Sequence, residues 1–199
     1  MADGLTIKQL RTHHVGPLDL AVAHGECVVL SGASGAGKTL LLRAIADLDE
    51  HEGEVRLDGH SCRAMRAHEW RRRVALLPAE SQWWGEHIGD HFSRVDETLL
   101  GELGFRPEVM GWQVARCSTG ERQRLALLRL LQHAPEVLLL DEPTASLDAE
   151  NVARVEALLQ RLRRERQLAL LWVSHDTAQT ARVATRRLQI VAGKLQERA

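Results

Sequence analysis

The 199 residues are 44% hydrophobic and 27% charged, a balance that is typical of a folded globular protein and argues against disorder. This length suits one domain, or one domain with an inserted subdomain, and argues against two full domains. Lysine and arginine number 26 against 27 acidic residues, so the chain has no overall basic field and we expect no nucleic-acid partner.

Neither export nor membrane insertion is indicated. The first residues lack both the basic region and the apolar segment of a signal peptide. The longest apolar run, residues 168–173, is far shorter than the roughly 20 residues that cross a bilayer. Three widely spaced cysteines suggest neither a disulfide framework nor a zinc site, and the histidines are scattered. We therefore expect a cytoplasmic protein.

The first part of the chain alternates strands with turns. Apolar residues predict strands over 5–10 and 18–22, followed by a turn at 24–25 and a strand over 26–30 that is buried on both faces. A glycine-rich loop comes next, and the leucines from residue 39 to 48 have helical spacing. Further strands are predicted over 53–57 and 74–77, the second ended by Pro78.

The middle of the chain has a different character. Residues 81–134 contain no strand-like run, and their leucines have helical spacing, which predicts a helical subdomain inserted into an α/β core. Strands then return over 137–140, 168–173 and 188–191, with a helix over 149–166. Such alternation predicts a single α/β domain over 1–199 with a mostly parallel sheet. We place its core at about 1–80 and 133–199 and the helical subdomain at about 81–132.

The glycine-rich loop matches the spacing Gly-x-x-x-x-Gly-Lys-Ser/Thr, between a buried strand and a helix. Glycines let successive backbone N–H groups surround phosphates, and the helix N-terminus adds positive charge. We expect Lys38 to reach the β- and γ-phosphates of a nucleotide and Thr39 to ligate Mg²⁺. The predicted nucleotide-binding residues are Gly32, Ala33, Ser34, Gly35, Ala36, Gly37, Lys38 and Thr39.

A second motif is the apolar strand 137–140, which ends in Asp141 and Glu142. A carboxylate delivered beside the glycine-rich loop would hold Mg²⁺, a role that we assign to Asp141 together with Thr39. The next acid, Glu142, would then polarise an attacking water. Apolar runs that end in an acid are common, so this motif indicates a Mg²⁺ site only in combination with the glycine-rich loop.

A third motif points to a family. Residues 117–124, Cys-Ser-Thr-Gly-Glu-Arg-Gln-Arg, precede a leucine-rich helix and resemble the Leu-Ser-Gly-Gly-Gln signature of ABC-type ATPases. Ala-Ser-Leu-Asp at 145–148 resembles the D-loop of that family, which contributes Asp148, and Val-Ser-His-Asp at 173–176 resembles its switch-histidine segment, which contributes His175. The resemblance covers residues 32–176.

The resemblance implies a P-loop NTPase with a RecA-like, mostly parallel core, an N-terminal antiparallel β region and the inserted helical subdomain. It also implies an Mg²⁺-dependent ATPase in which two copies form a homodimer around ATP. Glu142 would be the general base, with Lys38 and His175 on the γ-phosphate. The signature residues of one copy would then contact the nucleotide of the other; they are Ser118, Thr119, Gly120 and Glu121.

The partner and substrate also follow from the resemblance. A cassette without a membrane span implies a separate multi-span membrane subunit, which would hold the chain at the inner face of the cell membrane. Residues 74–92 and 169–176 most resemble small bacterial cassettes of the FetA type, which are tied to iron export, and haem-exporter cassettes are a second match. Two alternatives stay open: a SufC-like assembly ATPase and a weakly hydrolysing nucleotide-binding regulator.

Several positions depart from the family pattern. Ala79 stands where the family has a glutamine, and Thr119 stands where its signature has a glycine. The chain has no tyrosine, so His13 or His14 is expected to stack on adenine in place of the usual aromatic ring. Residues 83–84 are adjacent tryptophans, which would either anchor the membrane subunit or pack in the core of the helical subdomain.

Overall fold

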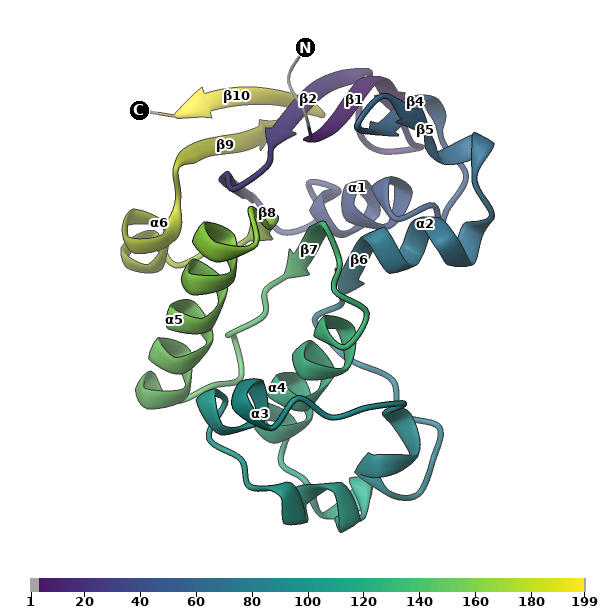
Figure 1. Ribbon diagram of the computed structural model, residues 1–199. Coiled ribbons are helices and arrows are strands. Elements are labelled where there is room, and N and C mark those ends of the chain that lie inside the picture. Colours follow the sequence, from purple (N-terminus) through teal and green to yellow (C-terminus); the bar gives the residue numbers. More distant parts are fainter. Residues whose placement is uncertain (1–3, 199) are drawn as a thin grey trace.

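The computed structural model describes residues 4–198, arranged as two sheets with helices between and below them (Figure 1). The strands are β1 Gly4–Arg11, β2 Leu18–Ala23, β3 Cys27–Gly32, β4 Glu52–Leu57, β5 His60–Ser61, β6 Val74–Leu77, β7 Val137–Asp141, β8 Ala169–Val173, β9 Arg186–Val191 and β10 Lys194–Arg198. The α-helices are α1 Lys38–Ile45, α2 Ala67–Arg73, α3 Glu97–Glu102, α4 Thr119–Leu131, α5 Ala149–Glu165 and α6 Thr177–Val183.

The smaller sheet is antiparallel, in the order β2-β1-β4-β5, and lies above α1 in Figure 1. Its strand β2 alternates strictly between buried and exposed residues, with Leu18, Leu20 and Val22 turned inward. This is the pattern of a strand with one face on the core and one face toward solvent. The predicted N-terminal antiparallel region is therefore confirmed.

The larger sheet has the order β10-β9-β3-β8-β7-β6, and all of its neighbouring pairs are parallel except β9 and β10. Strands β7 and β8 are buried along their whole length, because helices or the other sheet cover both faces. Their carboxyl ends lie beside that of β3, since β3 pairs with β8 and β8 with β7. Residues that follow these three strands therefore gather at one edge of the sheet.

Two hydrophobic clusters lie on opposite faces of the parallel sheet. Val28 and Leu30 of β3 pack in one cluster with α1 and the antiparallel sheet. Their neighbours Cys27 and Val29 pack in the other cluster with α3, α4 and α5. Successive side chains of a strand point to opposite faces, so a single apolar run supplies both clusters. This is why β3 appears in the sequence as an uninterrupted apolar segment.

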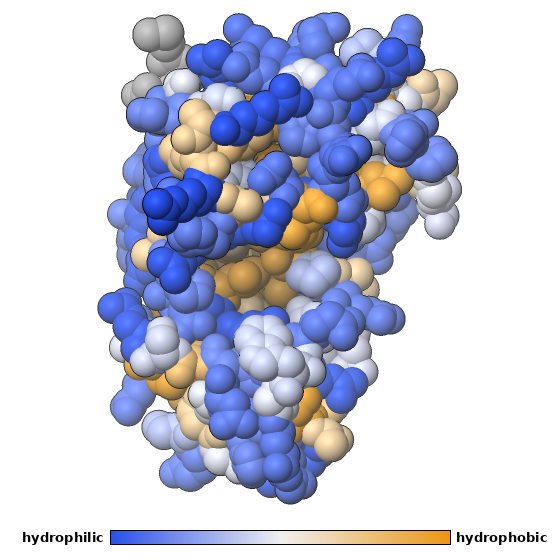
Figure 2. All heavy atoms as spheres, turned by 90° about the vertical axis from the view of Figure 1, so that its right-hand side faces the viewer, coloured by the Kyte–Doolittle hydropathy of each residue, from blue (hydrophilic) through white to orange (hydrophobic). Residues whose placement is uncertain are grey.

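Helices α3 and α4 and three 3-10 helices occupy the segment between β6 and β7, at the lower end of Figure 1. The 3-10 helices are Ile88–His91, Pro107–Gly111 and Val114–Arg116. On the face shown in Figure 2, hydrophobic side chains lie in a hollow between the upper and lower parts of the molecule. The division of the chain at about residues 80 and 133 stays a prediction.

Four elements were missed by the sequence patterns, namely β5, α2, α6 and β10. The short helix α2 buries only Trp70, and α6 buries only Gln179 and Val183, so neither has an apolar periodicity. The strand β10 follows the strand that we expected to be the last, and it is mostly exposed at the sheet edge. Leu48, expected on the helix face, lies beyond the end of α1 and is 41% exposed.

Candidate nucleotide-hydrolysis site

The glycine-rich loop joins the end of β3 to the start of α1. Residues 33–35 are exposed, and Gly37 adopts φ +91°, a left-handed conformation that other residues rarely adopt. A Cβ at Gly37 would lie 2.1 Å from Cγ2 of Val15, so the connection between β1 and β2 packs directly on the loop. Close packing and backbone conformation both require glycine at this position.

Lys38 is folded into the loop. Its side chain is 7% exposed, and Nζ donates hydrogen bonds to the carbonyl oxygens of Gly32 and Ala33, both at 2.9 Å. A buried ammonium group needs such partners, because leaving it unpaired would cost several kcal/mol. The loop therefore holds a positive charge at the N-terminus of α1, where an anionic group is also favoured by the helix dipole.

Thr39 and Asp141 meet across the end of the sheet. Thr39 Oγ1 donates to Asp141 Oδ2 at 2.8 Å, although the two residues are far apart in the sequence. Burial raises the pKa of Asp141, while the hydrogen bond from Thr39 acts in the opposite direction. A hydroxyl and a carboxylate oxygen side by side are hard ligands that suit Mg²⁺, which prefers one or two protein oxygens together with phosphate and water.

Glu142 and His175 form the next pair at the same edge. Glu142 Oε1 lies 3.2 Å from His175 Nε2, and both side chains are partly exposed. The Glu142 N–H donates to the carbonyl oxygen of Val173 at 3.1 Å, and Glu142 itself adopts φ +49°. The backbone thus turns sharply after β7 and is tied to β8, which brings the carboxylate to the imidazole.

The signature-like segment stands at the start of α4. Ser118 is the N-cap: its Oγ accepts from the Glu121 N–H at 3.2 Å, and Glu121 Oε2 accepts from the Ser118 N–H at 2.7 Å. The hydrogen bond from Ser118 lowers the pKa of Glu121. The side chain of Thr119 is exposed, so the β-branched residue is accommodated in the first turn of the helix.

Gly120 approaches the D-loop-like segment of the same chain. A Cβ at Gly120 would lie 2.9 Å from the carbonyl oxygen of Ser146 and 3.0 Å from Cδ2 of Leu147. Two residues later in that segment, Asp148 caps α5 by accepting from the Asn151 N–H at 2.8 Å. The structure thus places the signature-like residues against residues 146–147. Burial raises the pKa of Asp141, and the charges of Lys38 and His175 lie close enough to act in the opposite direction.

His13 and His14 lie in a bend after the end of β1, and both are exposed. The strand itself ends at Arg11, so the two side chains are not held in the alternating arrangement of a strand. The neighbouring Val15 contacts the glycine-rich loop, which places both histidines near it. His13 also lines a hollow of about 400 Å³.

The exposed loop at Ala79 receives a carboxamide that the sequence analysis missed. Gln123 of α4 is 4% exposed, its Nε2 donates to the carbonyl oxygen of Pro78 at 3.0 Å, and its Oε1 accepts from Ser81 Oγ at 3.3 Å. The local sequence around Ala79 contains no signal for this contact, because Gln123 comes from a distant helix. The loop after β6 is therefore held to α4.

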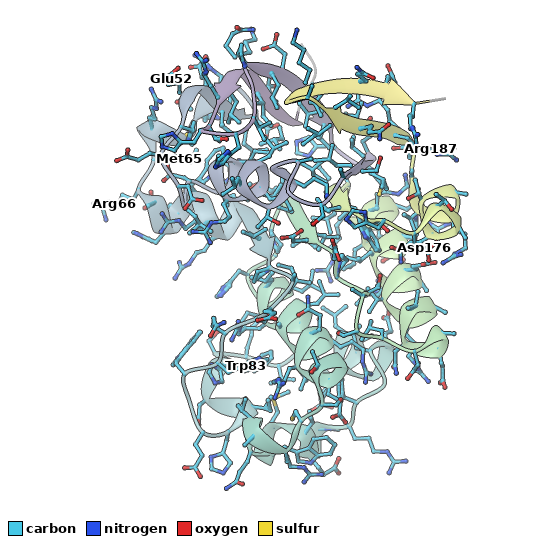
Figure 3. All side chains as sticks on the ribbon, turned by 180° about the vertical axis from the view of Figure 1, so that it is seen from behind. Glu52, Met65, Arg66, Trp83, Asp176 and Arg187 are labelled. Atoms are coloured by element: carbon cyan, nitrogen blue, oxygen red, sulfur yellow. The ribbon has the colours of Figure 1, made fainter. Side chains whose placement is uncertain are left out.

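The two adjacent tryptophans have different environments. Trp83 is partly buried against the second hydrophobic cluster, whereas Trp84 is 76% exposed. The buried ring of His91 packs edge-on against both, with centroid distances of 4.8 and 4.4 Å, and the Arg129 guanidinium lies 4.5 and 5.0 Å from the two rings. Figure 3 shows Trp83 in the lower part of the molecule, away from Asp176 at the start of α6. The environment of Trp83 thus suits packing in the core, and that of Trp84 suits the anchoring role.

A loop of this kind after a buried strand, beside a Thr–Asp pair, defines a P-loop nucleotide-binding protein. A model of the ABC transporter family matches residues 15–145. The chain therefore belongs to the ABC transporter family, as one of its ATP-binding domains, which are P-loop ATPases. No helix among residues 4–198 is long and apolar enough to cross a membrane.

Relatives and solved structures agree with this assignment. An aliphatic sulfonates import ATP-binding protein of Nocardia farcinica is 39% identical over 184 residues, covering 90% of this chain and 72% of that protein. A protein of the same description from Burkholderia pseudomallei is 35% identical over 181 residues, and the match covers 89% of this chain but only 55% of that protein. This chain thus spans about half to three quarters of the length of these relatives.

The fold matches those of known cassettes. The ATP-binding cassette MJ0796, in a dimeric post-hydrolysis state bound to ADP and Pi, superposes with a TM-score of 0.84 at 21% identity, covering 98% of this chain and 97% of that one. A bacterial Atm1-family ABC exporter with ATP bound gives the same TM-score and identity, covering 38% of its chain. The predicted RecA-like, P-loop fold is confirmed.

Proposed function

We propose that this chain binds Mg-ATP, hydrolyses it, and drives a transport path formed by a separate membrane subunit. The observation that carries the proposal is the juxtaposition of two pairs at one sheet edge, Thr39–Asp141 at 2.8 Å and Glu142–His175 at 3.2 Å. One pair would bind a metal ion and the other would act as acid and base, next to a buried lysine in a glycine-rich loop. Phosphoryl transfer to water requires these groups.

The glycine-rich loop would hold the phosphates. Its backbone N–H groups and the start of α1 would bind phosphate oxygens, and the Lys38 ammonium would exchange the carbonyl oxygens of Gly32 and Ala33 for the β- and γ-phosphates. Thr39 Oγ1 and Asp141 Oδ2 would hold Mg²⁺, which neutralises developing charge on the phosphates when bound. This arrangement would place the γ-phosphate beside Glu142.

Glu142 would act as the general base. Its partly exposed carboxylate is open to solvent and would accept a proton from a water, which leaves that water's oxygen free to attack the γ-phosphate. His175 Nε2 faces Glu142 Oε1 and would hold the carboxylate, the water and a γ-phosphate oxygen in line. Removing the proton acceptor is therefore expected to stop hydrolysis and to spare nucleotide binding.

A second copy would complete the site. Ser118, Thr119, Gly120 and Glu121 present the N-terminus of α4, which is a natural anion site, although they pack against residues 146–147 of their own chain. In a head-to-tail homodimer this helix end would face the γ-phosphate bound by the partner copy. Asp148, at the start of α5, would lie beside that interface.

For the transporter, import is better supported than export. The relatives described above are named as import proteins for aliphatic sulfonates. We therefore propose a small organic anion as the transported substrate; no comparison supports the expected FetA-like iron export. Trp84, exposed beside Arg129 at the helical end of the molecule, is the proposed anchor for the membrane subunit, which would hold the chain at the membrane surface.

Phosphate release from Mg-ATP by the purified chain tests the hydrolytic proposal. Lys38→Ala is the blank, because it removes the buried ammonium group from the loop. We expect the wild type to release phosphate from Mg-ATP. We expect no release by Lys38→Ala, and none by the wild type without Mg²⁺. Nucleotide binding without turnover would favour the regulator alternative, to which Ala79 and the lack of an aromatic stacker point.

Partner capture tests the transport proposal. The tagged chain and its Trp84→Ala variant are expressed in the native host and purified from detergent-solubilised membranes and, separately, from the cytosol. We expect a multi-span protein to co-purify with the wild type and to be depleted with Trp84→Ala. A partner found only in the cytosol would contradict the transporter proposal and favour the SufC-like assembly alternative.

A further inference from the structure

A buried hydrogen-bond network joins the loops that carry Glu142 and His175, and Gln179 of α6 lies at its centre. Gln179 is 3% exposed. Its side chain contacts Thr144, two residues after Glu142, and Ser174, which directly precedes His175. Figure 3 labels Asp176 at the start of this helix. A single side chain thus holds both loops.

The chemistry of the network fixes the orientation of the Gln179 amide. Nε2 donates to Thr144 Oγ1 at 2.9 Å and to Glu156 Oε1 at 3.0 Å, while Oε1 accepts from Ser174 Oγ at 2.9 Å. An ionised carboxylate only accepts, so the NH₂ group must face Glu156 and the carbonyl must face Ser174. The Ser174 hydroxyl oxygen in turn accepts from the Asp176 N–H at 3.1 Å.

The far side of the network is anchored on a helix. Glu156 of α5 is 9% exposed and receives two hydrogen bonds from Arg182, at 2.9 and 2.7 Å. Burial acts to raise the pKa of Glu156, but the hydrogen bonds from Arg182 and Gln179 outweigh it, so the pKa lies below its ordinary value. Gln179 therefore donates to an ionised carboxylate that Arg182 holds in place, and through Gln179 both loops are tied to helix α5.

We propose that Gln179 is a positioning residue for ATP hydrolysis. It holds the loops that carry Glu142 and His175 in the relative position that places Glu142 Oε1 3.2 Å from His175 Nε2. The inference rests on the proposed function, in which this pair activates water. Within residues 4–198, the hydrogen bonds of the Gln179 side chain go to Thr144, Ser174 and Glu156, and none goes to the glycine-rich loop. Its effect should therefore fall on kcat rather than on ATP binding.

Gln179→Leu removes all three hydrogen bonds and nearly keeps the volume. We expect kcat to fall about 10- to 100-fold, because small displacements of a catalytic pair have effects of this size, and KM for ATP to change less than about threefold. The matched control is Thr180→Val on the same helix, which removes a hydrogen bond to the Asp176 carbonyl oxygen outside the network. Its kcat should equal that of the wild type.

Exchanging the Gln179 amide and the Glu156 carboxylate distinguishes an effect of their hydrogen bond from an effect of side-chain packing. Gln179→Glu places a second carboxylate beside Glu156 and should lower kcat as Gln179→Leu does. Adding Glu156→Gln restores one amide and one carboxylate in contact, so the double variant should regain most of the lost activity. A folded double variant with no recovery would overturn the inference.

The imidazole signal of His175 in nucleotide-free NMR spectra gives a readout that needs no turnover. We expect it to move in Gln179→Leu and to stay in place in Thr180→Val, with His175→Gln identifying the signal. A moved signal in a chain without ATPase activity would support the positioning role and count against the proposed hydrolysis. An unchanged signal and an unchanged kcat would overturn the inference while leaving the proposed function intact.

Discussion

At the scale of single residues, the site consists of charged groups held where water is scarce. Asp141 is 5% exposed and Lys38 is 7% exposed, so each depends on near neighbours for its stability. Lys38 has two carbonyl oxygens and Asp141 has the Thr39 hydroxyl. A bound metal and phosphates would supply the missing opposite charges, which is why such a site favours its ligands over an empty state.

Asp141→Asn tests the cost of burying this carboxylate. Because burial raises the pKa of Asp141, its ionisation lowers the stability of the free chain at neutral pH. We expect the variant to have a higher Tm at pH 7, by roughly 2–4 °C if the gain is about 1 kcal/mol. It should also lose Mg²⁺-dependent turnover.

The difference in Tm between Asp141→Asn and the wild type should depend on pH. A raised carboxyl pKa means that the folded chain binds more protons, so the penalty in the wild type grows as pH rises above about 4. The gap in Tm between Asp141→Asn and the wild type should therefore shrink from pH 7 toward pH 4.5. A gap that widens on acidification would contradict this account.

Adenine recognition is a second question at the residue scale. His13 and His14 are exposed near the glycine-rich loop, and no tyrosine is available. If an imidazole stacks on the base, His13→Ala combined with His14→Ala should weaken ATP binding about 5- to 10-fold, the loss of about 1 kcal/mol of stacking. Calorimetric titration measures it, and an affinity equal to that of the wild type would remove both residues from the site.

At the scale of elements, the start of α4 depends on two tight features. One is the reciprocal cap between Ser118 and Glu121, and the other is the close approach of Gly120 to Ser146 and Leu147. Together they fix the signature-like helix end against the segment that leads into α5. This contact joins the helical end of the molecule to the edge of the sheet where the predicted catalytic residues lie.

Gly120→Ala should disturb that contact. The added Cβ would lie 2.9 Å from a backbone oxygen, so the helix end must move, at a cost of about 1–3 kcal/mol in the free energy of unfolding. Gly101→Ala in α3 is the matched control, because a Cβ there meets nothing within 4 Å and alanine favours a helix. Denaturant unfolding checks both; equal stability of the two variants would mean that the approach of Gly120 is not tight.

The tryptophan cluster should respond to pH. Burial lowers the pKa of His91, whose ring packs edge-on against Trp83 and Trp84 and accepts a hydrogen bond from the Gly85 N–H. The nearby Arg129 charge also lowers this pKa, and Asp90 acts in the opposite direction. The unfolded chain therefore binds a proton more readily, and the stability from neutral His91 is lost as pH falls below about 6.5. Wild type should lose stability relative to His91→Gln between pH 7.5 and 5.5, and parallel curves would contradict the prediction.

The sequence predicted the elements with contiguous signals and missed those held by distant contacts. Strands β3, β7 and β8 are apolar because both faces are covered, and the motifs that follow them are local. In contrast, Gln123 reaches the loop at Ala79 from α4, and Gln179 joins two loops from a helix without apolar periodicity. Such polar contacts depend on the tertiary arrangement, so no window of sequence contains their signal.

At the scale of the whole molecule, the proposed site gathers at one sheet edge, and the proposed homodimer would complete it. The glycine-rich loop, Asp141, Glu142 and His175 lie after β3, β7 and β8, whereas the signature-like residues stand at the start of α4 against residues 146–147. In the proposed function, ATP binding drives the association of two copies. We therefore expect ATP to bring two copies of this chain together.

Glu142→Gln tests ATP-driven dimerisation, because it removes the proposed base and leaves Lys38, Thr39 and Asp141 in place. Light scattering after size-exclusion chromatography, with Mg-ATP, gives the mass. We expect no turnover and a dimer of twice the 22.3 kDa chain for Glu142→Gln, and a monomer for Glu142→Gln combined with Ser118→Arg. Wild-type turnover in Glu142→Gln, or a monomer with bound ATP at high protein concentration, would contradict this expectation.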